Sequence, residues 1–183
     1  MRQGPRGNPA ALRIRAAGGL LLVVHLALVA WITLRPLDVP WVAAPNFHPF
    51  AGIKADLALG PTQATRRIGE GLGLLAPLGV LLPMAGGRIA VSPLASLLRT
   101  VTAGALLSLG IELLQTGVPG QVVDVDSMLL NTLGVALAHI ALVPAFRART
   151  RRRKETARRA AALRREESPL TPTPTIPRVG IAP

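Results

Sequence analysis

Residues 111–134, IELLQTGVPGQVVDVDSMLLNTLG, place carboxylates and amides inside or beside segments that are apolar enough to cross a bilayer. The polar residues of interest in this stretch are Glu112, Gln115, Asp124, Asp126 and Asn131. Such groups are costly at membrane depth unless they pair, face the interior of a helix bundle or line a wet cavity. We therefore treat this cluster as a candidate functional site.

The composition of the whole chain favours a membrane protein. Half of the 183 residues are hydrophobic and 16% are charged, whereas a typical soluble domain has about 25% charged residues. The net charge is +12, and ten of the 21 Lys and Arg residues lie within residues 147–165. Such a chain is either a nucleic-acid binder or a membrane protein with a cytoplasmic tail, and the apolar segments favour the membrane. Cysteine is absent, which excludes disulfides and thiolate metal sites.

Four apolar segments approach the roughly 17 to 25 residues that a transmembrane helix needs. They are residues 16–34, 67–84, 94–115 and 127–146. A cleaved signal peptide is the alternative for the first, but its apolar run exceeds the roughly 7 to 15 residues of a signal sequence and it lacks a clear A-x-A site. The second is short and is interrupted by Pro77. We predict an all-α membrane protein, a bundle of four transmembrane helices.

The distribution of Lys and Arg predicts the orientation, because cytoplasmic loops carry an excess of these residues. Basic residues flank the start of the first span, the turn after the second and the end of the fourth, whereas residues 117–126 contain none. We therefore predict that both termini are cytoplasmic. The first loop, residues 35–66, also contains basic residues, but the C-terminal basic block outweighs it.

The chain is predicted to divide into four regions. Residues 1–15 form a basic cytoplasmic N-terminus, 16–146 the four-span membrane domain, 147–167 a basic cytoplasmic helix and 168–183 a disordered Pro-rich tail. The basic helix should be attracted to anionic lipids by about 1 kcal/mol per basic residue near the surface. We expect no specific nucleic-acid partner.

On this topology, polar side chains from separate segments meet at the outer ends of the spans, which we call the external rim. The predicted rim residues are Glu70, Glu112, Gln115, Asp124, Asp126 and Asn131. Three basic residues at the same level are candidates for binding an anion, namely Arg35, Arg66 and Arg67. We expect a mixed-charge site at the level of the lipid headgroups.

Helical spacing predicts stripes of small and polar residues that face neighbouring helices. These are Gly104, Ser108, Glu112 and Gln115 on the third span, Asn131, Gly134 and Ala138 on the fourth, and the GxxxG pair Gly69 and Gly73 on the second. In the alternative interpretation, the polar members of these stripes only form hydrogen bonds between helices and brace the bundle.

The chemistry of the predicted rim is not decided by spacing. Neighbouring carboxylates suit acid–base chemistry or proton transfer, and carboxylate and amide oxygens also suit Mg²⁺ or Ca²⁺. His25 and His139 fall near mid-membrane at similar depth, but no third ligand is evident there. We therefore expect no metal and no cofactor. No histidine lies in the rim to act as a nucleophile, so we assign no enzymatic activity.

Five motifs in a fixed order resemble the VanZ-like family of small bacterial integral membrane proteins. They are NFHPF at residues 46–50, LLAPLGVLLP at 74–83, and IELLQ, VVDVDS and LLNTLG within 111–134. The resemblance covers roughly residues 16–146. It implicates Glu112, Gln115, Asp124, Asp126 and Asn131, with Asn46, Pro49, Phe50, Pro77 and Gly79 as supporting positions.

The chain departs from the family pattern at three positions. Gln121 stands where the family usually has an arginine, Ser127 where a second aspartate usually follows, and Gly71 where the second span often has an asparagine. Loss of the arginine removes a partner that would neutralise Asp124 or hold an anionic substrate. Glu70, next to Gly71, is a candidate replacement for the lost polar group.

The resemblance implies a multi-pass protein of the bacterial plasma membrane, in a family whose namesake is linked to low-level teicoplanin resistance. Our first hypothesis is an envelope protein that binds or modifies an anionic lipid or cell-wall precursor at the outer leaflet. The alternatives are a small proton-coupled transporter and a structural or assembly protein with no catalytic site. Four spans are few for a transporter, although a homo-oligomer would supply more, and no broken helix repeats in two halves.

Overall fold

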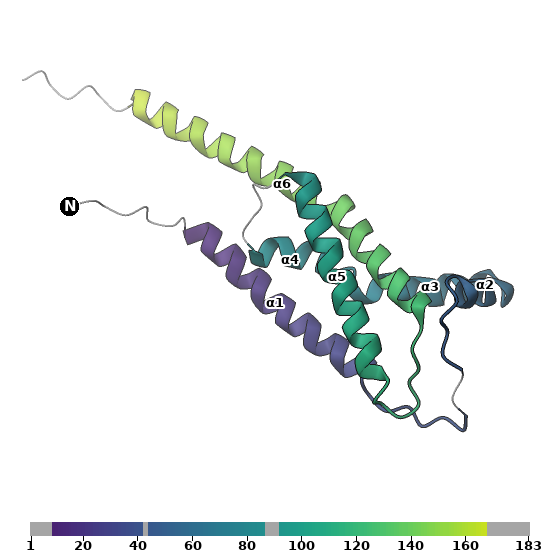
Figure 1. Ribbon diagram of the computed structural model, residues 1–183. Helices are drawn as coiled ribbons and strands as arrows, with labels where there is room; N and C mark the ends of the chain where they lie inside the picture. The colour runs from purple at the N-terminus through teal and green to yellow at the C-terminus, as the bar shows by residue number, and fades with distance from the viewer. Residues whose placement is uncertain (1–8, 42–43, 87–91, 168–183) are drawn as a thin grey trace, which may run out of the picture. The chain divides into compact units, whose positions relative to one another are not determined.

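The computed structural model describes residues 9–41, 44–86 and 92–167 and is helical throughout these ranges apart from short loops (Figure 1). The helices are α1 (Pro9–Thr33), α2 (Ala51–Ala58), α3 (Pro61–Leu75), α4 (Leu78–Gly86), α5 (Pro93–Gln115) and α6 (Val125–Glu167). The described ranges contain no strand, only an isolated parallel bridge between Asn46 and Asp124. The all-α prediction is confirmed. The predictions for residues 1–8 and for the Pro-rich tail, 168–183, lie outside the described residues.

Four stretches of helix are long and apolar enough to cross a membrane, which confirms the predicted number of spans. They are Leu12–Thr33, Pro61–Gly86, Pro93–Gln115 and Val125–Arg164. Each begins before the position expected from hydropathy, because the helices continue into the polar segments that flank the apolar runs. The side of the membrane on which the termini lie stays a prediction.

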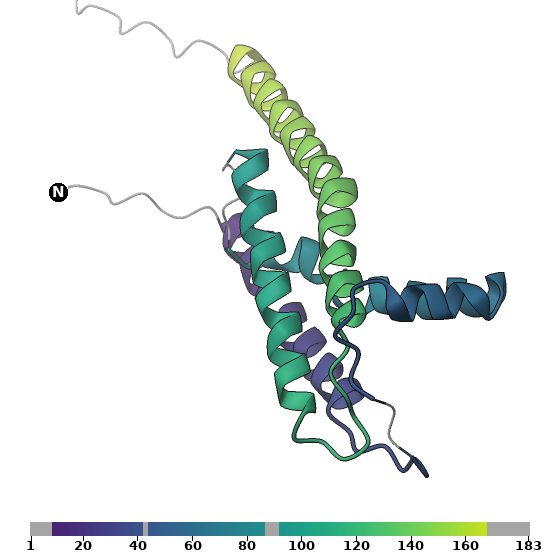
Figure 2. The same ribbon diagram turned by 45° about the vertical axis from the view of Figure 1, so that its right-hand side comes forward.

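The second span is interrupted at Pro77, as its sequence predicts. A proline has no backbone N–H and disturbs the preceding helical turn, and here α3 ends at Leu75 while α4 begins at Leu78. In both views α4 lies near α1, whereas α3 and the short helix α2 extend away from α1 and α5 (Figures 1 and 2). The loop before this span was not expected to contain a helix, so α2 is an addition to the predicted fold.

A second proline in this span explains the buried His139. Pro83 lies inside α4, so the carbonyl of Gly79, four residues earlier, loses its usual N–H partner. The Nδ1 atom of His139 lies 2.9 Å from this carbonyl oxygen, and the side chain is only 4% exposed. His139 therefore donates the hydrogen bond that the backbone cannot make, as the apolar interior of a bilayer requires.

The second mid-span histidine, His25, has its ring against the backbone of Leu74, next to the break in the second span. Among the described residues, no group of three or more His, Cys, Asp or Glu side chains is arranged to hold a metal ion. His139 thus contacts a carbonyl freed by Pro83, whereas His25 lies against the backbone of Leu74 and its buried Nε2 atom finds no hydrogen-bond partner among the described residues.

The predicted polar stripe of the third span is confirmed for Gly104, Ser108 and Glu112 but not for half-buried Gln115, and it extends further towards the start of the helix. The buried residues of α5 are Ser96, Thr100, Gly104, Ser108 and Glu112, each four positions apart. A separate apolar core is formed by Val29 of α1, Leu75, Leu78 and Val135 of α6. The interior of the bundle therefore has an apolar centre and a polar face on α5, beside which Asn131 and His139 of α6 are also buried.

Two glycines allow the second span and α6 to touch through their backbones. A Cβ atom added to Gly134 would overlap the carbonyl oxygen of Leu72, and one added to Gly79 would lie 2.5 Å from the carbonyl oxygen of Val135. The GxxxG prediction for the second span was wrong. A Cβ added to Gly69 or Gly73 would meet nothing within 4 Å among the described residues, because the core residues of this span turn a different face towards α6.

The chain divides into two compact units between Ala145 and Phe146, so the helix α6 contributes to both. In the second unit, α6 continues as far as Glu167 and carries the basic segment. Within this segment Thr150 and Thr156 donate hydrogen bonds to the carbonyl oxygens of Arg147 and Arg152, at 2.8 and 3.0 Å.

The backbone contact at Gly134 predicts a sharp difference between two glycine substitutions. Gly134→Ala should lower the free energy of unfolding by about 2 kcal/mol or more, because overpacking at a rigid contact forces the backbone apart. Gly73→Ala, in the same helix pair but facing open space, should be neutral or stabilising by up to about 1 kcal/mol. Thermal unfolding of the detergent-solubilised protein measures both. Equal effects of the two substitutions would contradict the assigned contact.

The hydrogen bond from His139 predicts an energetic coupling with Pro83. His139→Phe keeps a ring of similar size but leaves the carbonyl of Gly79 unpaired, at a cost of about 1–3 kcal/mol. In a Pro83→Ala background the helix has its own N–H for that carbonyl, so the same substitution should cost clearly less. A double-mutant cycle of unfolding free energies tests this, and additive effects would refute it.

Candidate functional site

Two loops that are far apart in sequence pair along their backbones and bring the candidate residues together. Leu37 N donates to Pro119 O at 3.0 Å and Asn46 N to Val123 O at 2.9 Å, while Val125 N donates to Asn46 O at 3.0 Å. Both views show these loops side by side near the ends of α1 and α5 (Figures 1 and 2). The segment after α1 is thereby held against the loop that joins α5 to α6.

The carboxylate of Asp126 caps the helix α2 from the first turn of α6. It accepts hydrogen bonds from the backbone N–H groups of Phe50, Gly52 at 2.7 Å and Ile53 at 3.2 Å. Phe50 occupies the N-cap position, with a left-handed φ of 67°, and its side chain has no oxygen with which to cap the helix. A negative charge at a helix N-terminus is also favourable to the helix dipole. Asp126 is only 2% exposed, so its carboxylate is committed to this structural role.

Asn46 connects the two aspartates of the outer loop. Its Nδ2 atom donates to Asp124 Oδ1 at 2.8 Å and lies 3.3 Å from Asp126 Oδ2, and its Oδ1 atom accepts from His48 N at 3.1 Å. Asp124 Oδ1 also accepts from Asp126 N at 3.0 Å. These bonds explain the role of the NFHPF segment. Asn46 donates to the carboxylate oxygens of the two aspartates, and the residues after exposed Pro49 form the N-terminus of α2.

Glu112 joins this arrangement from the last turns of α5. Its Oε2 atom accepts a hydrogen bond from Asp124 N at 2.8 Å, its carboxylate is also hydrogen-bonded by the Ser127 side chain, and the residue is 4% exposed. Ser127 stands where an aspartate was expected, and here it supplies a donor instead of a further negative charge. We call Asn46, Glu112, Asp124, Asp126 and Ser127 the polar cluster.

The polar cluster is acidic without a basic counterpart. None of its three carboxylates forms an ion pair with a Lys, Arg or His side chain within the ranges that the structure describes. Backbone N–H groups, Asn46 and Ser127 supply the hydrogen-bond donors instead. Asp126 is thus saturated, whereas Glu112 accepts only two hydrogen bonds although a carboxylate has about four acceptor positions.

Asn131 lies deeper between α5 and α6 and has one unused polar atom. Its Nδ2 atom donates to Ser108 Oγ at 3.0 Å, and the two residues are 2% and 0% exposed. The Oδ1 atom of Asn131 is buried and finds no hydrogen-bond partner among the described residues. An unsatisfied buried acceptor of this kind calls for an explanation.

Gln115 and Gln121 tie loops and helix ends together. Gln115 Nε2 donates to the carbonyl oxygen of Thr33 at the end of α1, at 3.1 Å. Gln121 Nε2 donates to the carbonyl oxygen of Arg35 at 3.3 Å. Gln121, which replaces the arginine that the resemblance predicts, is therefore used to hold the first loop, while the Arg35 residue itself is exposed.

The structure does not bring Glu70, Arg66 and Arg67 into the polar cluster, which corrects the predicted composition of the external rim. Arg66 pairs with Glu70 at 2.9 Å on the exposed surface of α3, and Arg67 pairs with Asp56 of α2 at 2.9 Å. The physical reason is that acids of α2 and α3 lie closer to these arginines. At Gly71, where the family often has an asparagine, an added Cβ atom would lie 2.9 Å from Cδ1 and 3.1 Å from Cβ of Leu130, so a larger side chain would require Leu130 to move.

Sequence reasoning missed three contributors to this region. The N–H groups at the start of α2 and the hydroxyl of Ser127 are both bound to acids that were predicted, and the role of Ser108 was seen only as part of a small-residue stripe. A signal for Ser108 exists, since it lies one turn before Glu112 on the same face. The capping of α2 has no local signal, because donor and acceptor are more than 70 residues apart.

The cap formed by Asp126 predicts a local effect of substitution. Asp126→Asn removes the charge and turns an N–H donor towards other donors, which should destabilise the start of α2 by about 2 kcal/mol. Amide hydrogen exchange at Gly52 and Ile53 should then quicken by about thirtyfold. Asp38→Asn, in an exposed part of the first loop, is the matched control. Unchanged exchange at Gly52 would show that the cap does not hold the helix.

The model of the VanZ/LLP1 family matches residues 22–147. No curated protein and no solved structure was found to match. The matched region runs from α1 into α6 and includes every residue of the polar cluster. This chain, which has four helical stretches long and apolar enough to span a membrane, belongs to the VanZ/LLP1 family.

Proposed function

We propose that this protein is a multi-pass protein of the bacterial plasma membrane that binds the headgroup of a lipid or of a lipid-linked cell-wall precursor at the polar cluster and at Asn131 next to it. Family membership and the four apolar helices support the membrane setting. The observation that carries the proposal is a pair of unused acceptors, the spare carboxylate positions of Glu112 and the Oδ1 atom of Asn131.

These two acceptors belong to facing helices and lie close in depth. Ser108 is one helical turn from Glu112 on α5, which corresponds to about 5.4 Å along the axis. Asn131 of α6 is hydrogen-bonded to that same Ser108. Leaving a buried acceptor unsatisfied costs about 1–3 kcal/mol. Hydroxyl or amine groups of a headgroup would supply the missing donors, and this preference for donors is what distinguishes the proposed ligand.

Exposed aromatic side chains support a position of the cluster near the headgroups. Trp41, Phe47 and Phe50 in the first loop are 79%, 64% and 57% exposed. Tryptophan is enriched at the membrane–water interface, and the loop that carries Trp41 and the two phenylalanines is fixed to the polar cluster through Asn46. Arg35, exposed in the same loop, is then the available cation for a phosphate or carboxylate of the ligand.

The family resemblance extends the proposal to antibiotic tolerance. A protein that binds a lipid-linked cell-wall precursor competes with, or alters access to, the envelope target of a glycopeptide. We accordingly propose a contribution to low-level teicoplanin tolerance. This step rests on the family resemblance, whereas the binding site rests on Glu112 and Asn131.

Glu112→Gln tests the function with little change in shape. The amide oxygen can still accept from Asp124 N, but the charge and one acceptor group are lost. In a bacterial host made tolerant by this protein, the substitution should reduce the minimum inhibitory concentration of teicoplanin to that of cells without the protein. Membrane abundance should stay unchanged.

Glu70→Gln is the control, since it removes an equal charge from the exposed surface of α3 and should leave tolerance intact. Full tolerance in the Glu112→Gln variant would contradict a ligand-binding role. A parallel loss of abundance and tolerance would instead indicate that the carboxylate only braces the bundle.

A further inference from the structure

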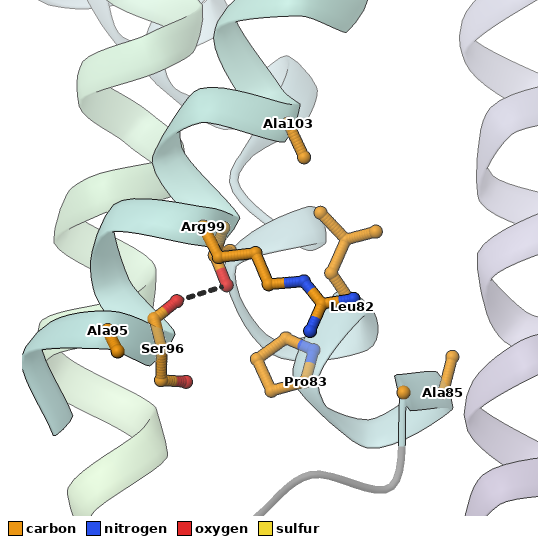
Figure 3. Close-up of a pocket in the computed structure, with 9 residues that line it drawn as sticks. Leu82, Pro83, Ala85, Ala95, Ser96, Arg99 and Ala103 are labelled. Carbon is orange, nitrogen blue, oxygen red and sulfur yellow. Dashed lines mark hydrogen bonds between the residues drawn. The ribbon is translucent and has the colours of Figure 1, made fainter. Parts of the chain in front are cut away.

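A pocket with a volume of about 330 Å³ lies between α4 and the first turns of α5 (Figure 3). Its apolar wall includes Leu82, Pro83 and Ala103, and its polar residues are Ser96, Arg99 and Thr100. The wall is apolar on one side and carries one cationic side chain, a combination that suits an amphiphile with a negative charge.

The pocket is separate from the polar cluster. Arg99 and Glu112 are 13 positions apart on α5, which corresponds to about 20 Å along the helix axis. The two sites therefore lie near opposite ends of the same span. A ligand of the pocket would come from the leaflet on the other side of the membrane from the cluster.

Arg99 has no acidic partner among the residues that the structure describes. Figure 3 shows its side chain extending from α5 across the pocket towards Pro83 of α4. It lies six residues inside the candidate span Pro93–Gln115. An arginine at such a depth is stabilised when its guanidinium reaches a lipid phosphate near the interface.

Ser96 provides a second donor at the same place. It is 8% exposed, and its hydroxyl forms no hydrogen bond to any described residue, whereas Thr100 Oγ1 is already bound to the Ser96 carbonyl oxygen at 2.8 Å. Ser96 and Arg99 are three positions apart on α5, about one helical turn, and both line the pocket. Together they can bind two oxygens of one phosphate group.

We propose that this pocket binds an anionic phospholipid, with the phosphate held by Arg99 and Ser96 and the start of an acyl chain against Leu82, Pro83 and Ala103. The volume is at the lower end of the range for ligand pockets, which suits a headgroup and the first part of a chain, with the rest of the lipid in the bilayer. The site does not depend on the ligand proposed for the polar cluster.

Lipid titrations of the purified full chain in neutral detergent, followed by native mass spectrometry, test the proposal. Phosphatidylglycerol should bind more tightly than phosphatidylcholine. Arg99→Gln should weaken phosphatidylglycerol binding by about tenfold or more, as expected for the loss of charge-assisted hydrogen bonds. Arg99→Lys, which keeps the charge, should retain most of the affinity. Ala103→Leu should weaken binding by filling the apolar wall.

Arg13→Gln is the matched control, because it removes the same charge from the first turns of α1 at the corresponding end of the bundle. Its phosphatidylglycerol affinity should equal that of the unaltered protein. Equal losses for Arg13→Gln and Arg99→Gln would overturn the site in favour of a general charge effect. Undiminished binding by Arg99→Gln would overturn it as well, and so would glycerol phosphate binding as tightly as the lipid.

Discussion

The carboxylate of Asp126 is the interaction on which the candidate site depends. Asp126 lies in the first turn of the last span. Its carboxylate accepts hydrogen bonds from three backbone N–H groups at the start of α2 and from the side chain of Asn46. Without these bonds, the pairing of the first loop with the loop after α5 would lose its anchor. The position of Glu112 is linked to the same arrangement, since Asp124 N binds its carboxylate. A residue that the sequence places in a candidate functional site is thus chiefly architectural.

The bilayer imposes the second constraint, namely that every backbone polar group inside it must find a partner. Prolines in the second span break this rule locally, and the side chain of His139 restores it for Gly79. The close contact of Gly134 with Leu72 then lets α6 pack directly on the interrupted region. Pro83, His139 and Gly134 therefore act together in packing the second span against α6, although nothing in the sequence alone connects the three residues.

The sequence predicted those features that follow from periodicity and composition. The four spans, the break at Pro77 and the buried face of α5 through Ser108 and Glu112 all repeat over many residues, so their signals accumulate. The grouping of Glu70 with the other acids failed because membrane depth alone does not say which face of a helix a residue occupies. The prediction that Gly69 faces a neighbouring helix was wrong for the same reason. The short helix α2 was not predicted because its N-terminal cap comes from a segment that is distant in the sequence.

That distant cap has a consequence for the order in which the chain assembles. An isolated helix of eight residues is unstable in water, and α2 is followed by two further spans before Asp126 is synthesised. The first N–H groups of α2 can therefore receive this cap only after the final hairpin has formed, although α2 already pairs with α3 through Asp56 and Arg67. A chain that lacks the fourth span would leave these N–H groups without the carboxylate of Asp126.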